Sequence, residues 1–180
     1  NNGTSALHLA LLAAGIGAGD EVITVPFTFI ASASAIHYTG ATPVFVDIDP
    51  ETFQIDPEKI EKKITPNTRA ILPVHILGLP ADIIRIMEIA KKHNLKVIED
   101  VAQALGSVYA FHDGTKKSGG TMSTIGTTSF FPSKNLGCYG DGGAIFTNND
   151  ELALKMRNIV NHGMTVRYYH DYVGVNSRLD

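Results

Sequence analysis

The chain has little cysteine, no long apolar run and no excess of positive charge. Its single cysteine, Cys138, excludes a disulfide within the chain and fits a reducing compartment, so a cytoplasmic location is expected. A net charge of −3 gives no basic field, so nucleic acid is not an expected partner. The longest apolar stretches are too short and too often interrupted to span a bilayer, so no membrane partner is expected either.

The chain does have enough apolar residues for one sizeable core, with 44% hydrophobic content over 180 residues. Helical patterns lie between most of its short, β-rich runs, and this alternation predicts an α/β fold with a mostly parallel sheet. The runs that predict buried strands are Glu21–Val25, Pro43–Asp47, Arg69–His75, Lys96–Asp100, Thr127–Phe131 and Gly143–Asn148.

Helix boundaries are marked by residues that suit helix ends. An apolar helix is predicted over Ala6–Ala14 and another from Pro57, where proline occupies the first turn. A third is predicted from Asp82 to a stop at Asn94, with basic residues in its last turn that suit the helix dipole. The Gly/Ser/Thr-rich segment Asp113–Thr124 predicts a surface loop or hairpin.

Lys134 follows an apolar, strand-like segment and enters a Ser/Gly-rich loop. Ammonium groups are rarely buried without a partner, because losing hydration is costly. Desolvation lowers the pKa of a lysine, and the free amine can then attack a carbonyl. Lys134 is therefore a candidate for a covalent bond to a carbonyl compound, although taken alone it could be an ordinary loop lysine.

Asp100 ends the predicted strand that begins at Lys96. Ligands bind at the carboxyl ends of strands in open α/β sheets, and a carboxylate there can pair with the protonated ring nitrogen of pyridoxal phosphate (PLP). Gln103 could lie beside the ring and reach its phenolic oxygen. Taken alone, Asp100 could instead cap a helix that starts at Val101.

Hydroxyl and aromatic groups complete this candidate PLP site. Thr4 and Ser5 lie at the start of the first predicted helix, where free N–H groups and the helix dipole favour a phosphate. Ser129 offers a further hydroxyl near Lys134, and Phe29 offers a flat face for a ring. Each signal is weak alone, because Ser/Thr caps are common and Phe29 could belong to the core.

With these motifs in order, the chain resembles the DegT/DnrJ/EryC1/StrS family of PLP-dependent sugar aminotransferases. The motifs that carry the resemblance are residues 2–7, 26–29, 99–103, 129–135 and 176–179. The resemblance implies the large domain of PLP-dependent transferase fold type I, the aspartate aminotransferase-like fold. Residues 1–180 would be most of that PLP-binding domain, truncated at both ends and without the small C-terminal domain, so the chain alone is expected to be inactive.

The resemblance also implies a role for each site residue. Lys134 would bond the cofactor and later move a proton between the substrate carbon and the cofactor carbon. Asp100 would keep the ring nitrogen protonated, and both are expected to be catalytic. Gln103 would lie near the phenolic oxygen, and Phe29 would stack on the ring. The residues expected to hold the phosphate are Thr4, Ser5 and Ser129.

Two further cofactor-binding residues, Asn176 and Arg178, rest on the resemblance entirely. It implies that they reach the site from the neighbouring subunit of a homodimer, so that the active site is shared. Arg167, Tyr168 and His170 could touch an anionic substrate or lie in a solvated loop. His75 follows a strand and could approach the site. No metal site is predicted, because the histidines lack metal-ligand spacing.

The implied reaction moves an amino group from an amino acid, glutamate, to a nucleotide-linked keto-sugar, in amino-sugar or cell-surface polysaccharide biosynthesis. The segment 134–144 looks most like the branch that aminates UDP-linked 3-keto-hexuronates. Two alternatives stay open: a non-catalytic PLP-fold binding or regulatory module, and a PLP-dependent sugar dehydratase or lyase. Lys134 favours transamination, because the sugar 3-dehydratase branch of the family carries histidine there. The sequence leaves open which sugar, which carbon and which pathway.

Overall fold

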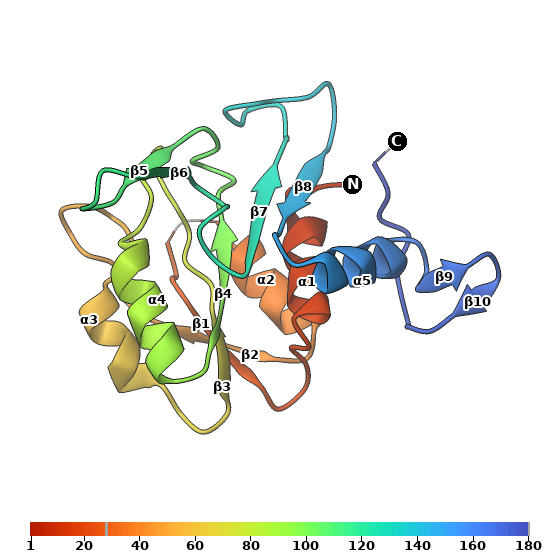
Figure 1. The fold of residues 1–180 in the computed structure, drawn as a ribbon, viewed down its shortest axis with the longest axis horizontal. Coiled ribbons are helices and arrows are strands. Elements are labelled where there is room, and N and C mark those ends of the chain that lie inside the picture. The colour runs from red at the N-terminus through yellow and green to blue at the C-terminus, as the bar shows by residue number, and fades with distance from the viewer. Residues whose placement is uncertain (28, 180) are drawn as a thin grey trace.

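The computed structural model describes residues 1–27 and 29–179, and a six-stranded sheet lies at its centre (Figure 1). The strands have the order β2-β1-β3-β4-β7-β8, and all neighbours are parallel except β7 and β8. They are β1 (Glu21–Thr24), β2 (Thr42–Phe45), β3 (Thr68–Ile71), β4 (Lys96–Asp100), β7 (Ile125–Ser129) and β8 (Gly143–Phe146). All six predicted strands are therefore present, and the predicted mostly parallel sheet is confirmed.

Helices cover the sheet in two layers, with α1, α2 and α5 on one face and α3 and α4 on the other (Figure 1). The helices are α1 (Gly3–Ala13), α2 (Ala31–Tyr38), α3 (Pro57–Ile60), a short 3₁₀ turn (Glu61–Lys63), α4 (Ile83–Lys92) and α5 (Asp150–Val160). The alternation of strands and helices places the carboxyl ends of the parallel strands at one edge of the sheet.

Helix α4 shows why the sequence signals were reliable. Asp82 Oδ1 accepts a hydrogen bond from the Arg85 N–H at 3.2 Å and caps the start of the helix. Ile86 and Ile89 are buried against the sheet, in keeping with a spacing of three to four residues along one face. Asn94 adopts a left-handed conformation with φ of 54° and ends the helix, as predicted.

The core lies where both helical layers meet the central strands. Ile71, Ile98 and Ile125 from three neighbouring strands are completely buried. Leu11 of α1 and Ile86 of α4 are completely buried as well, on opposite faces of the sheet. Each such side chain contributes about 1.5–3 kcal/mol by leaving water. The strand ends that carry the candidate site are therefore held by a well-packed core.

The carbonyl end of α1 is bound by two lysines from other elements. Lys155 Nζ donates to the Ala13 carbonyl at 3.0 Å, and Lys96 Nζ donates to the Ala14 carbonyl. Cations are favourable there, because the helix dipole places partial negative charge at this end. These bonds tie α1 to α5 and to the first residue of β4.

Two small hairpins lie outside the main sheet. The first pairs β5 (Val108–Ala110) with β6 (Lys116–Ser118), so the predicted surface hairpin is present but begins before Asp113. The second pairs β9 (Met164–Val166) with β10 (Tyr169–His170). Among the described residues, none of the helices has the length and apolar character needed to cross a membrane.

Candidate active site

A cavity of about 680 Å³ lies at the carboxyl edge of the sheet, where β4 and β7 end. Its volume is within the usual range for a cofactor or small-molecule site. The structure brings seven of the nine predicted cofactor-binding residues to this cavity. These residues are Thr4, Ser5, Phe29, Asp100, Gln103, Ser129 and Lys134.

Asp100 is the most firmly fixed of these residues. Its carbonyl accepts the His75 N–H at 2.8 Å, which extends the pairing of β4 beyond the end of β3. Its Oδ1 accepts the Ala102 N–H at 3.1 Å, and its Oδ2 accepts the Ser32 hydroxyl at 2.9 Å. No helix starts at Val101, where the chain makes a turn, so the alternative that Asp100 is only a helix cap is wrong.

The Asp100 carboxylate is buried beside the cavity, with 5% of the residue exposed. Burial raises its pKa above the ordinary value, against the opposing effects of the Ala102 and Ser32 hydrogen bonds and the Lys134 charge. It forms no ion pair with any described residue. A protonated ring nitrogen in the cavity would supply the missing positive partner, so this carboxylate fits the pyridine ring of PLP.

The start of α1 forms a cradle for an anion. Asn2 Oδ1 accepts the Ser5 N–H at 2.8 Å and caps the helix, while the N–H groups of Gly3 and Thr4 find no acceptor among the described residues. Gly3 packs so closely on Ser129 that an added Cβ would lie 2.5 Å from the Ser129 Cβ. Free N–H groups, the helix dipole and hydroxyls thus converge, and this combination fits a phosphate group.

Lys134 faces the same cavity and is half-buried. Its backbone N–H donates to the Phe131 carbonyl at 2.8 Å, so the lysine lies in a tight turn two to five residues after β7. Within the described part of the chain, its ammonium makes neither a hydrogen bond nor an ion pair. A lysine without a partner beside a buried carboxylate fits the carbonyl group of PLP.

Gln103 and Phe29 lie where a ring could meet them. Gln103 is half-buried, and its carbonyl accepts the Gly78 N–H at 3.1 Å, which fixes the backbone beside the cavity. Phe29 is 69% exposed at the cavity, so the alternative that it belongs to the core is wrong. Its ring is available to a ligand face, and stacking on a cofactor stays a prediction.

Asn176 and Arg178 are exposed and do not line the cavity of their own chain. Arg178 Nη1 donates to Asn161 Oδ1 beside the end of α5. Their action from a neighbouring subunit stays a prediction. The hairpin that holds Arg167 also lies outside the cavity lining, and its guanidinium lies over the Tyr168 ring at 5.1 Å.

Three further residues around Asp100 were not among the predicted cofactor-binding residues, and one of them, Ser32, lines the cavity. Ser32 binds Asp100, as described above. Glu99 and His75 are completely buried and form a pair of 2.9 Å between Oε2 and Nε2. Glu99 belongs to the motif 99–103, but nothing in the sequence indicated that its carboxylate pairs with His75. Ser32 had no signal, because it contacts Asp100 across 68 residues of sequence.

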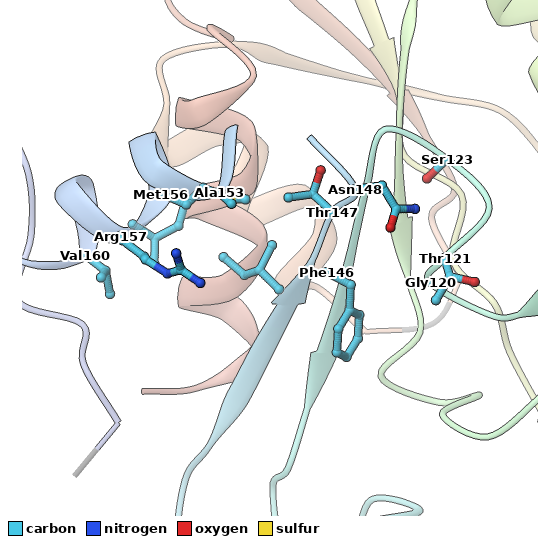
Figure 2. Close-up of a pocket in the computed structure, with 12 residues that line it drawn as sticks. Gly120, Thr121, Ser123, Phe146, Thr147, Asn148, Ala153, Met156, Arg157 and Val160 are labelled. Carbon is cyan, nitrogen blue, oxygen red and sulfur yellow. The ribbon is translucent and has the colours of Figure 1, made fainter. Parts of the chain in front are cut away.

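A second cavity, of about 450 Å³, lies between α5, the end of β8 and the turn at Gly120, and it is shown in Figure 2. Phe146 and Thr147 from the end of β8, Met156 and Arg157 from α5, and the turn at Gly120 line it. None of the predicted site residues belongs to this lining. Of the two cavities, only the one at the carboxyl edge is lined by predicted site residues.

A buried carboxylate, an anion cradle and a lysine without a partner among the described residues meet in one cavity, and this combination fits PLP. The model of the DegT/DnrJ/EryC1/StrS aminotransferase family matches residues 1–180, so the chain belongs to this family. Its members use PLP, and the neighbouring structures carry the α/β fold of PLP-dependent aminotransferases. The predicted family, fold class and cofactor are therefore confirmed.

The chain is similar to named proteins from several bacteria. It is 56% identical to the pleiotropic regulatory protein of Geobacillus stearothermophilus, over 99% of this chain and 47% of that protein. It is 54% identical to the UDP-2-acetamido-2-deoxy-3-oxo-D-glucuronate aminotransferase of Pseudomonas aeruginosa, over 99% of this chain and 48% of that protein. The chain thus spans about half the length of the curated relatives it matches.

Two solved structures illustrate the similarity of fold. DesV of S. venezuelae is 47% identical with a TM-score of 0.92, over 99% of this chain and 47% of that chain. NtdA of Bacillus subtilis, solved with bound pyridoxamine phosphate (PMP), is 41% identical with a TM-score of 0.88, over 99% of this chain and 40% of that chain.

Proposed function

We propose that the protein containing this chain is an aminotransferase that moves an amino group from an amino acid, glutamate, to a nucleotide-linked keto-sugar. The observation that carries the proposal is the meeting of Lys134, Asp100 and the anion cradle of α1 in one cavity. PLP, when bound, supplies a carbonyl and an electron-withdrawing ring that stabilises negative charge on the substrate carbon.

Each residue of the cavity has a distinct task in this reaction. The first turn of α1 and Ser129 bind the phosphate and set the position of the ring. Asp100 holds a proton on the ring nitrogen, and the buried setting makes that charge pair strong. Lys134 Nζ would hold the group covalently and, once released, would carry a proton between the substrate and the cofactor. The side chains orient the reactants and exclude water.

The substrate class follows from the names of the relatives, which act on UDP-, GDP- and dTDP-linked sugars. We place the protein nearest the branch that aminates UDP-linked 3-keto-hexuronates, because the relative at 54% identity carries that activity in its name. We also propose a cytoplasmic homodimer in which Asn176 and Arg178 complete the partner's site. Both are exposed and lie outside the cavity of their own chain, and this position at the surface supports the proposal.

The decisive experiment maps the covalent bond. The complete protein is incubated with PLP, reduced with borohydride and digested, and the modified peptide is identified by mass spectrometry. A pyridoxyl group on Lys134, lost in Lys134→Ala and kept in Lys62→Ala, is the expected result. Lys62 is a matched control because it is an exposed lysine outside the cavity. Label scattered over surface lysines would refute the proposed role of Lys134.

The same protein separates transamination from the two alternatives. With glutamate and PLP, an aminotransferase converts the bound cofactor to PMP and releases 2-oxoglutarate in equal amount. A regulatory module of this fold would bind PLP without this conversion. A dehydratase or lyase would release a product without transferring the amino group to the sugar.

A further inference from the structure

Ser32 makes a buried contact that the proposed reaction does not yet use. It lies in the first turn of α2, with 4% of the residue exposed, and its hydroxyl donates to Asp100 Oδ2 at 2.9 Å. Among the described residues, no other side chain donates a hydrogen bond to this carboxylate. A serine in a helix commonly returns its hydroxyl to a nearby backbone carbonyl, as Thr39 does to Ile36 at 2.7 Å. Ser32 gives its only O–H to Asp100 instead.

The contact fixes how the carboxylate is turned. The Ala102 N–H binds Oδ1 at 3.1 Å and Ser32 binds Oδ2 at 2.9 Å, so each oxygen of Asp100 has one internal donor. Each ionised oxygen can accept a further bond, and Asp100 lines the cavity. A charged N–H···O bond needs an oxygen within about 2.7–2.9 Å in a suitable direction. Free rotation of the carboxylate would weaken that bond.

We propose that Ser32 is a positioning residue for the cofactor's ring nitrogen and that it acts through the Asp100 carboxylate. This inference rests on the proposed function, because it requires PLP in the cavity. The Ser32 hydroxyl also opposes the effect of burial on the pKa of Asp100 and so favours the ionised form. Ser32 lines the same cavity, but the role proposed for its hydroxyl is to hold the Asp100 carboxylate, not to exchange a proton with the substrate.

Binding of two cofactor forms tests whether Ser32 acts on the contact to the ring nitrogen or only stabilises the fold. The probes are PLP and its analogue in which the ring nitrogen is replaced by carbon, and the measurement is the dissociation constant of each. The complete protein is compared with Ser32→Thr and Ser32→Val, which differ from each other only in a hydroxyl against a methyl group. Urea unfolding midpoints of the variants report whether the shape change at this position disturbs the fold.

Ser32→Val is expected to weaken PLP binding by roughly tenfold or more relative to Ser32→Thr, since hydrogen bonds to charged groups are the stronger ones. The analogue without the ring nitrogen is expected to bind both variants alike. Equal losses for both cofactor forms would mean that Ser32 only supports the fold, and the proposal would be overturned. An unchanged affinity for PLP would overturn it as well.

The outcomes also distinguish this inference from the proposed function. If the unaltered protein binds PLP more tightly than the analogue, the cofactor and its ring-nitrogen contact stand, and only the role of Ser32 is decided by the variants. If the unaltered protein binds neither form, the proposed function fails first and the role of Ser32 fails with it. Should Ser32→Val unfold, Ser32→Ala supplies the variant without a hydroxyl for the same comparison.

Discussion

The buried Glu99 carboxylate offers a sharp test of how β4 is joined to His75 and to the turn at Gly120. Three donors converge on it, namely His75 Nε2 and the Gly120 N–H on Oε2 and the Met122 N–H on Oε1, each at 2.9 Å. The Ala81 N–H donates to His75 Nδ1 at 3.0 Å, so that nitrogen must be an acceptor and the proton must lie on Nε2. All three partners of Glu99 are therefore donors.

Glu99→Gln keeps the shape and replaces one acceptor oxygen by an NH₂ group. At least one of the three donors then faces another donor, and the remaining bonds lose the carboxylate charge. A buried donor without a partner costs about 1–3 kcal/mol, and hydrogen bonds to charged groups contribute about 1.5–3 kcal/mol. We expect the free energy of unfolding to fall by about 2–4 kcal/mol, a large share of the 5–15 kcal/mol typical of a domain.

Urea unfolding followed by far-UV circular dichroism measures this loss, since the chain has no tryptophan for a fluorescence assay. Glu88→Gln is the matched control, because its side chain is 61% exposed and, in the part of the chain that the structure describes, forms an ion pair with Arg85 alone. The free energy of unfolding of the control is expected to lie within about 0.5 kcal/mol of that of the unaltered protein. A Glu99→Gln variant as stable as that control would refute the reasoning that the three hydrogen bonds to Glu99 stabilise the fold.

The stabilisation that Glu99 gives the fold is expected to fall at acid pH. Burial raises the pKa of Glu99, but the hydrogen bonds from His75 and the backbone outweigh it and leave the pKa below the ordinary value of 4.5. A lowered pKa in the folded state means that the ionised group stabilises the fold fully above the unfolded-state value. That stabilisation is lost as the pH falls through the folded-state value. The difference in stability between the unaltered protein and Glu99→Gln should therefore be widest near neutral pH, begin to narrow below about 4.5, and close only below the lowered folded-state pKa of Glu99.

Three substitutions give further tests. Gly3→Ala places a Cβ 2.5 Å from the Ser129 Cβ and pushes the phosphate cradle open, so PLP titration should show roughly tenfold weaker binding. Gly126→Ala places a Cβ 1.9 Å from the Gly120 carbonyl oxygen, so the urea midpoint should fall with a loss of about 1–3 kcal/mol or more. Asp82→Ala removes the cap of α4 and should cost about 1 kcal/mol in the same assay.

Two other glycines serve as controls for the alanine variants. Gly17→Ala meets only the Thr39 carbonyl oxygen at 3.9 Å, an ordinary contact distance. Gly140→Ala meets nothing within 4 Å. Both variants should bind PLP and unfold like the unaltered protein. If these controls lost as much PLP affinity as Gly3→Ala, or as much stability as Gly126→Ala, close packing at Gly3 and Gly126 would not be the cause of the losses there.

The strands and capped helices could be predicted because their signals are local. β4 is a short apolar run, and its predicted and observed bounds agree at both ends. α4 carries a cap, an amphipathic face and a left-handed stop in one segment. α2 could not be assigned in the same way, because it consists largely of alanine and serine and its first residue is preceded by Ile30, whose side chain makes no cap. Its position depends on packing against α1 and the sheet.

The candidate site likewise contains residues with local signals in the sequence and residues without them. Residues in short motifs, such as Lys134 and Asp100, could be named because their chemistry and neighbours in sequence are distinctive. Ser32 could not be named, because its one informative contact lies on another element of the fold. His75 could be expected near the site, but its burial and pairing with Glu99 depend on the register of β3 beside β4. Long-range contacts of this kind are set by the fold as a whole.

The lysines bound at the end of α1 have a consequence for how the site keeps its dimensions. Lys96 begins β4, and Asp100 ends it, so the bond from Lys96 to Ala14 ties helix and strand together at the edge opposite the cavity. The helix and strand then act as a rigid frame that sets the separation between the phosphate cradle and the Asp100 carboxylate. A change in the loops around the cavity would then leave the separation between the phosphate cradle and Asp100 unaltered.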